Sequence, residues 1–132
     1  MKKTKFIICA LLAFVFIGSA SSQSLQFCED VSSDGAPINA SSVFNISSKG
    51  GFLKLLTTLP YRVGTTSVSY EVYRIDSDGN ENYDNSIWQD VEPSWTWFWK
   101  DVTFYDAGRF NIYVYDSDKN FLASSRITIQ YY

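Results

Sequence analysis

The stretch WFWKDVTFYDAGRFNIYVYD, residues 97–116, decides the fold class of this chain. It is rich in Val, Thr and aromatic residues, and Phe110, Ile112 and Val114 alternate with Asn111 and two tyrosines. Successive side chains of a β-strand point to opposite faces of the sheet, so this alternation is typical of a half-buried strand.

Similar stretches follow one another from Pro37 to the C-terminus, separated by Gly, Asp, Asn, Ser or Pro. Only GFLKLLTTL, residues 51–59, also fits a helical apolar stripe, and we interpret it as a strand because Gly50 and Pro60 bound it. About seven strands in about 100 residues favour a β-sandwich over a barrel or a propeller. The sequence therefore predicts an all-β fold.

The residues between two of these strands carry a spaced pattern. Val102 comes four residues before Asp106, which opens a D-x-G/A-x-Y-x-C-like pattern with Gly108, Phe110 and Ile112 in the later places. This pattern resembles the E-to-F strand region of immunoglobulin-like domains, and the resemblance implies an immunoglobulin-like β-sandwich of about seven antiparallel strands. The tyrosine and the second cysteine of the family are replaced here, so the resemblance implies a divergent, bacterial-style domain whose sheets are held by apolar packing.

The N-terminus reads as a secretory signal peptide, with three lysines, an apolar run from Phe6 to Ile17 and then small residues. That run of about 12 residues is shorter than the roughly 20 of a membrane-spanning helix, so we expect cleavage after Ala20 or Ser22 and no stable membrane insertion afterwards. The expected organisation is a signal peptide (1–22), a flexible lead (23–36) and the sandwich (37–132). The expected location is secreted or periplasmic.

The composition of the mature chain excludes several partners. Loss of the three leader lysines leaves 8 of the 11 basic residues against 14 acidic ones, and the remaining basic residues are scattered singly. Nucleic-acid binding needs clustered Lys and Arg, so we expect no nucleic-acid partner. Cys28 alone remains after cleavage, and it is either buried and inert or paired with another chain.

The residue types argue against catalysis. The chain has no histidine, which removes the usual general base at neutral pH and the commonest zinc ligand. We therefore expect a protein that is not an enzyme and that has no cofactor. A weak calcium candidate exists at one turn, where a hairpin is the better interpretation because the glycine spacing differs from that of a calcium-binding loop. Its oxygen ligands would come from Asp76, Asp78, Asn80 and Asn82.

The tryptophans raise the question of core or surface. Alternation places Trp95, Trp97 and Trp99 on one face of their strand and Phe98 on the other. A core without a disulfide needs bulky residues, and the immunoglobulin-like register implies inward positions before Val102, so we expect Trp97 and Trp99 to point inward. Trp95 and Phe98 then remain as candidates for outside contact.

The tyrosines offer a second candidate surface. If Tyr73, Tyr113 and Tyr115 lie on neighbouring strands, they line one outer sheet face, and such a surface is typical of protein interfaces and of sugar-stacking platforms. The candidate binding residues are Tyr73, Trp88, Trp95, Phe98, Tyr113 and Tyr115.

Three functions are consistent with these features. The leading hypothesis is a non-catalytic module that binds a protein partner through the aromatic sheet face, with Glu71, Asn111 and Arg126 setting specificity. The alternative is a carbohydrate-binding module in which exposed Trp and Tyr side chains stack on sugar rings. The third is a structural envelope subunit that forms a homo-oligomer through edge strands, as the unbroken β run RITIQYY (126–132) suggests.

Overall fold

The computed structural model describes residues 23–132, and the predicted signal peptide lies outside the described residues. All regular elements between residues 23 and 132 are strands, and none of that part is a helix long and apolar enough to span a bilayer. The ten strands are β1 (Ser24–Cys28), β2 (Asp30–Val31), β3 (Pro37–Ile38), β4 (Val43–Ile46), β5 (Gly51–Thr58), β6 (Ser67–Ile75), β7 (Glu81–Asp90), β8 (Trp97–Phe104), β9 (Gly108–Asp116) and β10 (Phe121–Tyr131).

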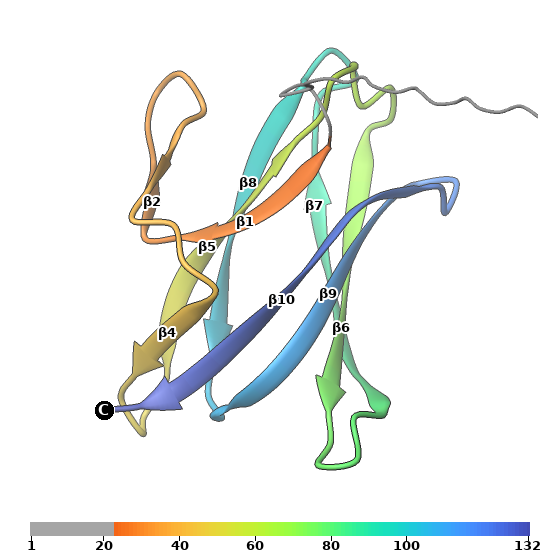
Figure 1. Ribbon diagram of the computed structural model, residues 1–132. Coiled ribbons are helices and arrows are strands. Elements are labelled where there is room, and N and C mark those ends of the chain that lie inside the picture. Colours follow the sequence, from red (N-terminus) through yellow and green to blue (C-terminus); the bar gives the residue numbers. More distant parts are fainter. Residues whose placement is uncertain (1–22) are drawn as a thin grey trace, which may run out of the picture.

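The strands form two sheets that face each other, with a small hairpin beside them (Figure 1). One sheet has the order β1-β5-β8 and the other β4-β10-β9-β6-β7, while β2 and β3 pair with each other. Neighbouring strands are antiparallel except for β4 and β10, which run parallel. Pairing of β5 with β8, and of β6, β9 and β10 in the other sheet, is the B–E and C–F–G arrangement of an immunoglobulin-like sandwich. The predicted fold class is therefore confirmed.

Apolar packing fills the space between the sheets. Phe110 and Ile112, which replace the tyrosine and the second cysteine of the family pattern, are both buried. The ring of Phe110 lies 5.2 Å, centroid to centroid, from that of Phe104 on β8, so these two rings join one sheet to the other. Contacts of this kind hold the sandwich together without an inter-sheet disulfide.

The N-terminal lead corrects the predicted boundary at residue 37. β1 pairs with β5 along its whole length, and Leu25 and Phe27 belong to the buried core. The prediction missed this strand because a five-residue segment flanked by polar residues is too short to show a clear alternation. The sandwich therefore includes residues from Ser24 onward.

The segment between β1 and β4 folds back as the β2–β3 hairpin over the outer face of the three-stranded sheet. Leu56 and Cys28 lie on that outer face, opposite the core, yet both are fully buried. Burial raises the pKa of the Cys28 thiol, which donates a hydrogen bond to the Lys54 carbonyl at 3.7 Å. The buried alternative for Cys28 is the one that the structure shows.

The expected orientation of β8 is wrong. Phe98 is 2% exposed and belongs to the core, whereas Trp99 is 39% exposed and Trp97 is half-buried on the outer face. The reason is the period of two along a strand: Phe98 lies an even number of residues before the inward Val102, so these two side chains share a face. The tryptophans before Val102 lie at odd separations and point the other way.

Part of the C-terminal run is already paired on both sides within the fold. Thr128–Tyr131 of β10 pair with β4 on one side, and residues up to Ile129 pair with β9 on the other. The sheet edges formed by long strands are β7 in the five-stranded sheet and β8 in the three-stranded sheet.

Candidate functional site

An aromatic surface covers the outer face of the five-stranded sheet, and we call it the tyrosine face. The register of β7, β6, β9 and β10 arranges its side chains in three cross-strand rows. The rows are Trp88, Ser69, Tyr115 and Phe121; then Ser86, Glu71, Tyr113 and Ser124; then Tyr83, Tyr73, Asn111 and Arg126.

The aromatic rings of this face contact one another edge to face. Tyr73 meets Tyr83 at a centroid distance of 5.8 Å and Tyr113 at 5.5 Å, and Tyr115 meets Phe121 at 6.1 Å. Such T-shaped pairs contribute beyond their buried area and hold each ring in one orientation. The face is therefore an ordered aromatic surface rather than a set of independent side chains.

Hydrogen bonds fix two tyrosine hydroxyls of the face. Glu81 accepts hydrogen bonds from the Tyr113 hydroxyl and from the Asn111 amide, and these bonds lower the pKa of the Glu81 carboxyl. The same bond to Glu81 raises the pKa of Tyr113 to about 12. The Tyr83 hydroxyl lies 2.6 Å from the Ser86 hydroxyl, which donates to Glu71.

A β-bulge brings Tyr83 onto this face. The pairing of β7 with β6 shifts by one residue at Asp84, so Tyr83 pairs with Tyr73 while Asn85 pairs with Val72. Strict alternation would place Tyr83 and Trp88 on opposite faces, but the extra residue of a bulge resets the alternation. Sequence reasoning missed Tyr83, Glu81 and Phe121 as members of the face for this reason and because cross-strand neighbours are unknown before pairing.

A second aromatic feature runs along β8, and we call it the tryptophan groove. It has a volume of about 600 Å³. Trp95 is 40% exposed and lies just before the strand, and Trp97 and Trp99 follow at alternate positions. The lining residues are Gln89, Ser94, Trp95, Thr96, Trp97, Phe98 and Trp99.

Neighbouring groups hold the two strand tryptophans in place. Gly35 of the hairpin lies against the Trp97 ring, where a Cβ would come within 2.6 Å of Cδ2. The Lys54 ammonium lies 4.1 Å from the centroid of Trp99 and forms an ion pair of 2.7 Å with Asp101. The groove is thus preformed by contacts on its rear side.

One glutamine links the groove to both sheets. Gln89 of β7 donates from Nε2 to the Trp99 carbonyl at 2.8 Å and accepts from the buried Tyr70 hydroxyl. Burial raises the pKa of Tyr70, which stays a hydrogen-bond donor. The side chain of Gln89 therefore closes the edge between β7 and β8 beside the groove.

The weak calcium candidate forms a hairpin turn. Asp76 Oδ1 accepts from the Asp78 and Asn80 backbone N–H groups at 2.9 Å each, and Asn82 donates to Oδ2 at 3.2 Å. The Asn80 and Asn82 bonds lower the pKa of the Asp76 carboxyl. This network orders the connection between β6 and β7. Residues 23–132 contain no group of three or more Cys, Asp or Glu side chains placed to hold a metal.

The turn between β9 and β10 has the same construction. Asp116 accepts from the Asp118 and Asn120 backbone N–H groups at 2.9 Å each. Lys119 adopts a left-handed φ of 68°, and Gly79 of the first turn is also left-handed, with a φ of 86°. Both loops are therefore Asp-anchored hairpin turns, and they lie at opposite ends of the sheet (Figure 1).

A smaller cleft lies farther along the edges of β7 and β8. Its lining includes Asp84, Tyr105, Asp106 and Arg74. The Arg74 guanidinium lies over the Phe110 ring and donates to the Ala107 carbonyl at 3.1 Å. Arg74 therefore already has partners within the fold on two sides of this cleft.

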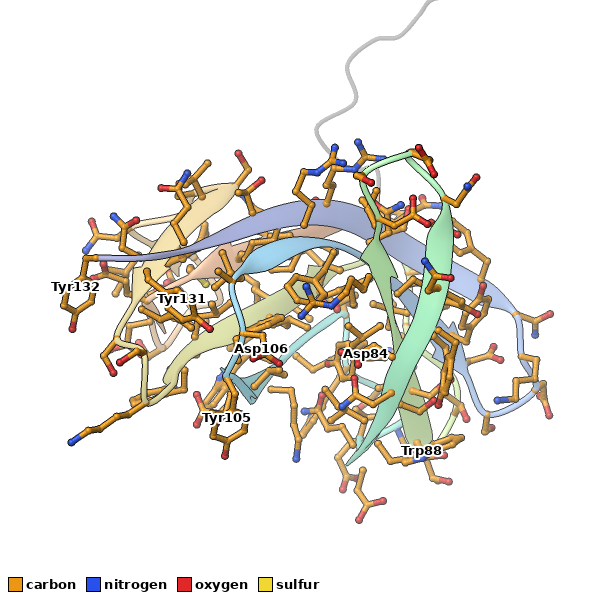
Figure 2. The ribbon with its side chains drawn as sticks, turned by 90° about the horizontal axis from the view of Figure 1, so that it is seen from below. Asp84, Trp88, Tyr105, Asp106, Tyr131 and Tyr132 are labelled. Atoms are coloured by element: carbon orange, nitrogen blue, oxygen red, sulfur yellow. The ribbon has the colours of Figure 1, made fainter. Side chains whose placement is uncertain are left out.

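The predicted binding residues divide into three places. Tyr73, Trp88, Tyr113 and Tyr115 lie together on the tyrosine face, Trp95 lies at the tryptophan groove, and Phe98 is buried beneath that groove. Figure 2 shows Trp88 on the side of the molecule away from Tyr131 and Tyr132, which are also exposed aromatic residues. The C-terminal tyrosines therefore lie apart from Trp88.

Solved structures that are similar to this chain include the following two. An immunoglobulin-like protein (PA1606) from Pseudomonas aeruginosa is 13% identical, with 86% of this chain and 100% of that chain covered and a TM-score of 0.49. The CARDB domain of the PF1109 protein from Pyrococcus furiosus, in complex with di-metal ions, is 11% identical, with 84% and 93% covered and a TM-score of 0.44. No protein-family model and no curated protein matches the sequence.

Proposed function

We propose that the mature chain is an exported, non-catalytic module that binds a protein partner through the tyrosine face. Immunoglobulin-like sandwiches are typically interaction modules, although the fold by itself names no partner. The observation that carries the proposal is the cross-strand array of six aromatic side chains: Trp88, Tyr115, Phe121, Tyr113, Tyr83 and Tyr73.

The composition and order of this face support a protein ligand. Tyr and Trp are enriched in protein interfaces because each offers a large apolar area with a polar end. Tyr83, Trp88 and Phe121 are each at least half exposed and are available for contact. The hydrogen bonds of Tyr113 with Glu81 and of Tyr83 with Ser86 orient these rings before binding, which reduces the entropy lost on association.

Site-specific photo-crosslinking tests this function. A benzoylphenylalanine at Tyr83, an exposed residue of the edge strand β7 on this face, should form a discrete adduct with one protein when the full chain is expressed in its source cells. The matched control is the same label at Phe52, which is 69% exposed on the outer face of the other sheet. Equal labelling from both positions, or no adduct from Tyr83, would contradict the assignment.

Export is tested separately. N-terminal sequencing of protein recovered from outside the cytoplasm should begin at Ser21 or Gln23, after removal of the leader. A chain recovered with Met1 and the three lysines intact would refute the signal-peptide interpretation.

A further inference from the structure

The tryptophan groove has features of a ligand site that the tyrosine face does not explain. Its volume of about 600 Å³ lies within the range of small-ligand pockets. Its indoles belong to β8 and the preceding turn, in the sheet opposite the tyrosine face. A protein bound flat on the tyrosine face therefore leaves the function of these tryptophans open.

The chemistry of the lining is neutral. The groove presents three indoles, one amide and two hydroxyl side chains, and among residues 23–132 no charged side chain lines it. Since the acidic residues of the chain exceed the basic ones, a neutral lining is a local property of this surface. Charge complementarity therefore favours a ligand without ionised groups.

The hydrogen-bonding groups match a ligand rich in hydroxyls. An amide NH₂ carries two donors, and Gln89 uses one of them on the Trp99 carbonyl, so its second N–H remains for a ligand. Ser94 and Thr96 are exposed and add hydroxyls that can donate or accept. The indole faces carry negative charge density and attract the weakly positive C–H face of a sugar ring.

We propose that the tryptophan groove binds a neutral oligosaccharide, with sugar rings stacked on Trp95 and Trp99 and hydroxyls bonded to Gln89, Ser94 and Thr96. Trp95 lies before β8 and Trp99 within it, with Trp97 between them, so the site extends over more than one sugar ring. Gly35 and Lys54 fix the indoles from behind, so that little ordering accompanies binding. This site is independent of the protein-binding function proposed for the tyrosine face.

Calorimetric titration with defined probes tests the proposal. Cellohexaose, xylohexaose, mannohexaose and chitohexaose are the neutral probes, trigalacturonate is the charged one, and decaproline represents an extended neutral peptide. We expect at least one neutral sugar to bind and to shift the tryptophan emission, while trigalacturonate and decaproline do not bind. Preferential binding of decaproline, or no binding of any neutral sugar at millimolar concentration, would overturn the proposal.

Two variants and one control locate the site. Trp95→Ala and Trp99→Ala should each weaken sugar binding about tenfold, the usual loss when one stacking ring is removed. Tyr83→Ala, on the tyrosine face, should leave sugar affinity unchanged, and it should abolish partner crosslinking from a label at Trp88. Trp95 lies outside the strands, so Trp95→Ala remains informative if Trp99→Ala unfolds, and a far-ultraviolet spectrum checks both variants. Sugar binding that survives Trp95→Ala unchanged, or that is lost in Tyr83→Ala, places the ligand elsewhere and refutes the proposal.

Discussion

The orientation of β8 makes a prediction about which aromatic residue stabilises the fold. Phe98 is 2% exposed and packs in the core, so Phe98→Ala removes a fully buried ring and leaves a cavity. Substitutions of this kind cost about 3–5 kcal/mol in the free energy of unfolding. Trp99 is 39% exposed and borders solvent, so Trp99→Ala leaves no closed cavity. We expect it to cost about 1–2 kcal/mol, part of which is the contact with Lys54.

Equilibrium unfolding in urea measures this difference. With an m-value of roughly 2 kcal/mol/M, Phe98→Ala should lower the midpoint by about 1.5–2.5 M, and Trp99→Ala by less than about 1 M. A small domain has a total stability of about 5–15 kcal/mol, so Phe98→Ala can be largely unfolded without denaturant. Phe98→Leu keeps most of the side-chain volume and then serves as the measurable variant, with an expected cost of about 1–2 kcal/mol.

The rank order decides between the two orientations of the strand. If the tryptophans filled the core, Trp99→Ala would be the more damaging substitution and Phe98→Ala would be nearly neutral. A midpoint for Trp99→Ala below that of Phe98→Ala would therefore refute the inward position of Phe98. Trp95→Ala, at a residue 40% exposed and outside the strands, serves as the control for loss of a tryptophan from the surface.

Three further perturbations test the surroundings of the two aromatic surfaces. Gly35→Ala introduces a Cβ 2.6 Å from the Trp97 ring at a φ of +87°, so it should lower the free energy of unfolding by about 1–3 kcal/mol in thermal unfolding. An unchanged melting temperature would contradict the packing of the hairpin against Trp97. The hydrogen bond to Glu81 raises the pKa of Tyr113 to about 12, so the stability that this bond contributes is complete below pH 10 and is lost as the pH rises toward 12. Glu81→Gln should therefore lower the pKa of Tyr113 in an ultraviolet titration, and Tyr113→Phe identifies which signal belongs to this residue. Ser69 is fully buried and its hydroxyl has no hydrogen-bond partner in residues 23–132. Ser69→Ala should therefore raise the free energy of unfolding by about 0.5–1 kcal/mol in chemical denaturation. A decrease in that free energy would indicate a partner for the hydroxyl.

The sequence was sufficient to predict the all-β class and the longer strands. β-Rich stretches with Asp-anchored turns predicted the hairpins of the five-stranded sheet. The resemblance of the pattern from Val102 to Ile112 implied an immunoglobulin-like sandwich, and the structure has the B–E and C–F–G pairing of that fold. These features are local, since turn chemistry and alternation act over a few residues. The tyrosines of β6 and β9 also followed from the sequence, because both strands alternate without interruption over Tyr73, Tyr113 and Tyr115.

The tertiary structure alone decided two things: which face of a strand points into the core, and where the alternation along a strand is interrupted. The strand from Trp97 to Phe104 has aromatic residues on both faces, so hydrophobicity by itself does not choose an inward side. Packing of Phe104 against Phe110 of β9 chooses it, and alternation then places Val102 and Phe98 on the same side. The β2–β3 hairpin covers the outer face of β8 through the contact of Gly35 with Trp97. The position of Tyr83 on the tyrosine face depends on a bulge that forms only when β7 pairs with β6. Alternation determines which side chains share a face, and only contacts between distant segments determine what that face meets.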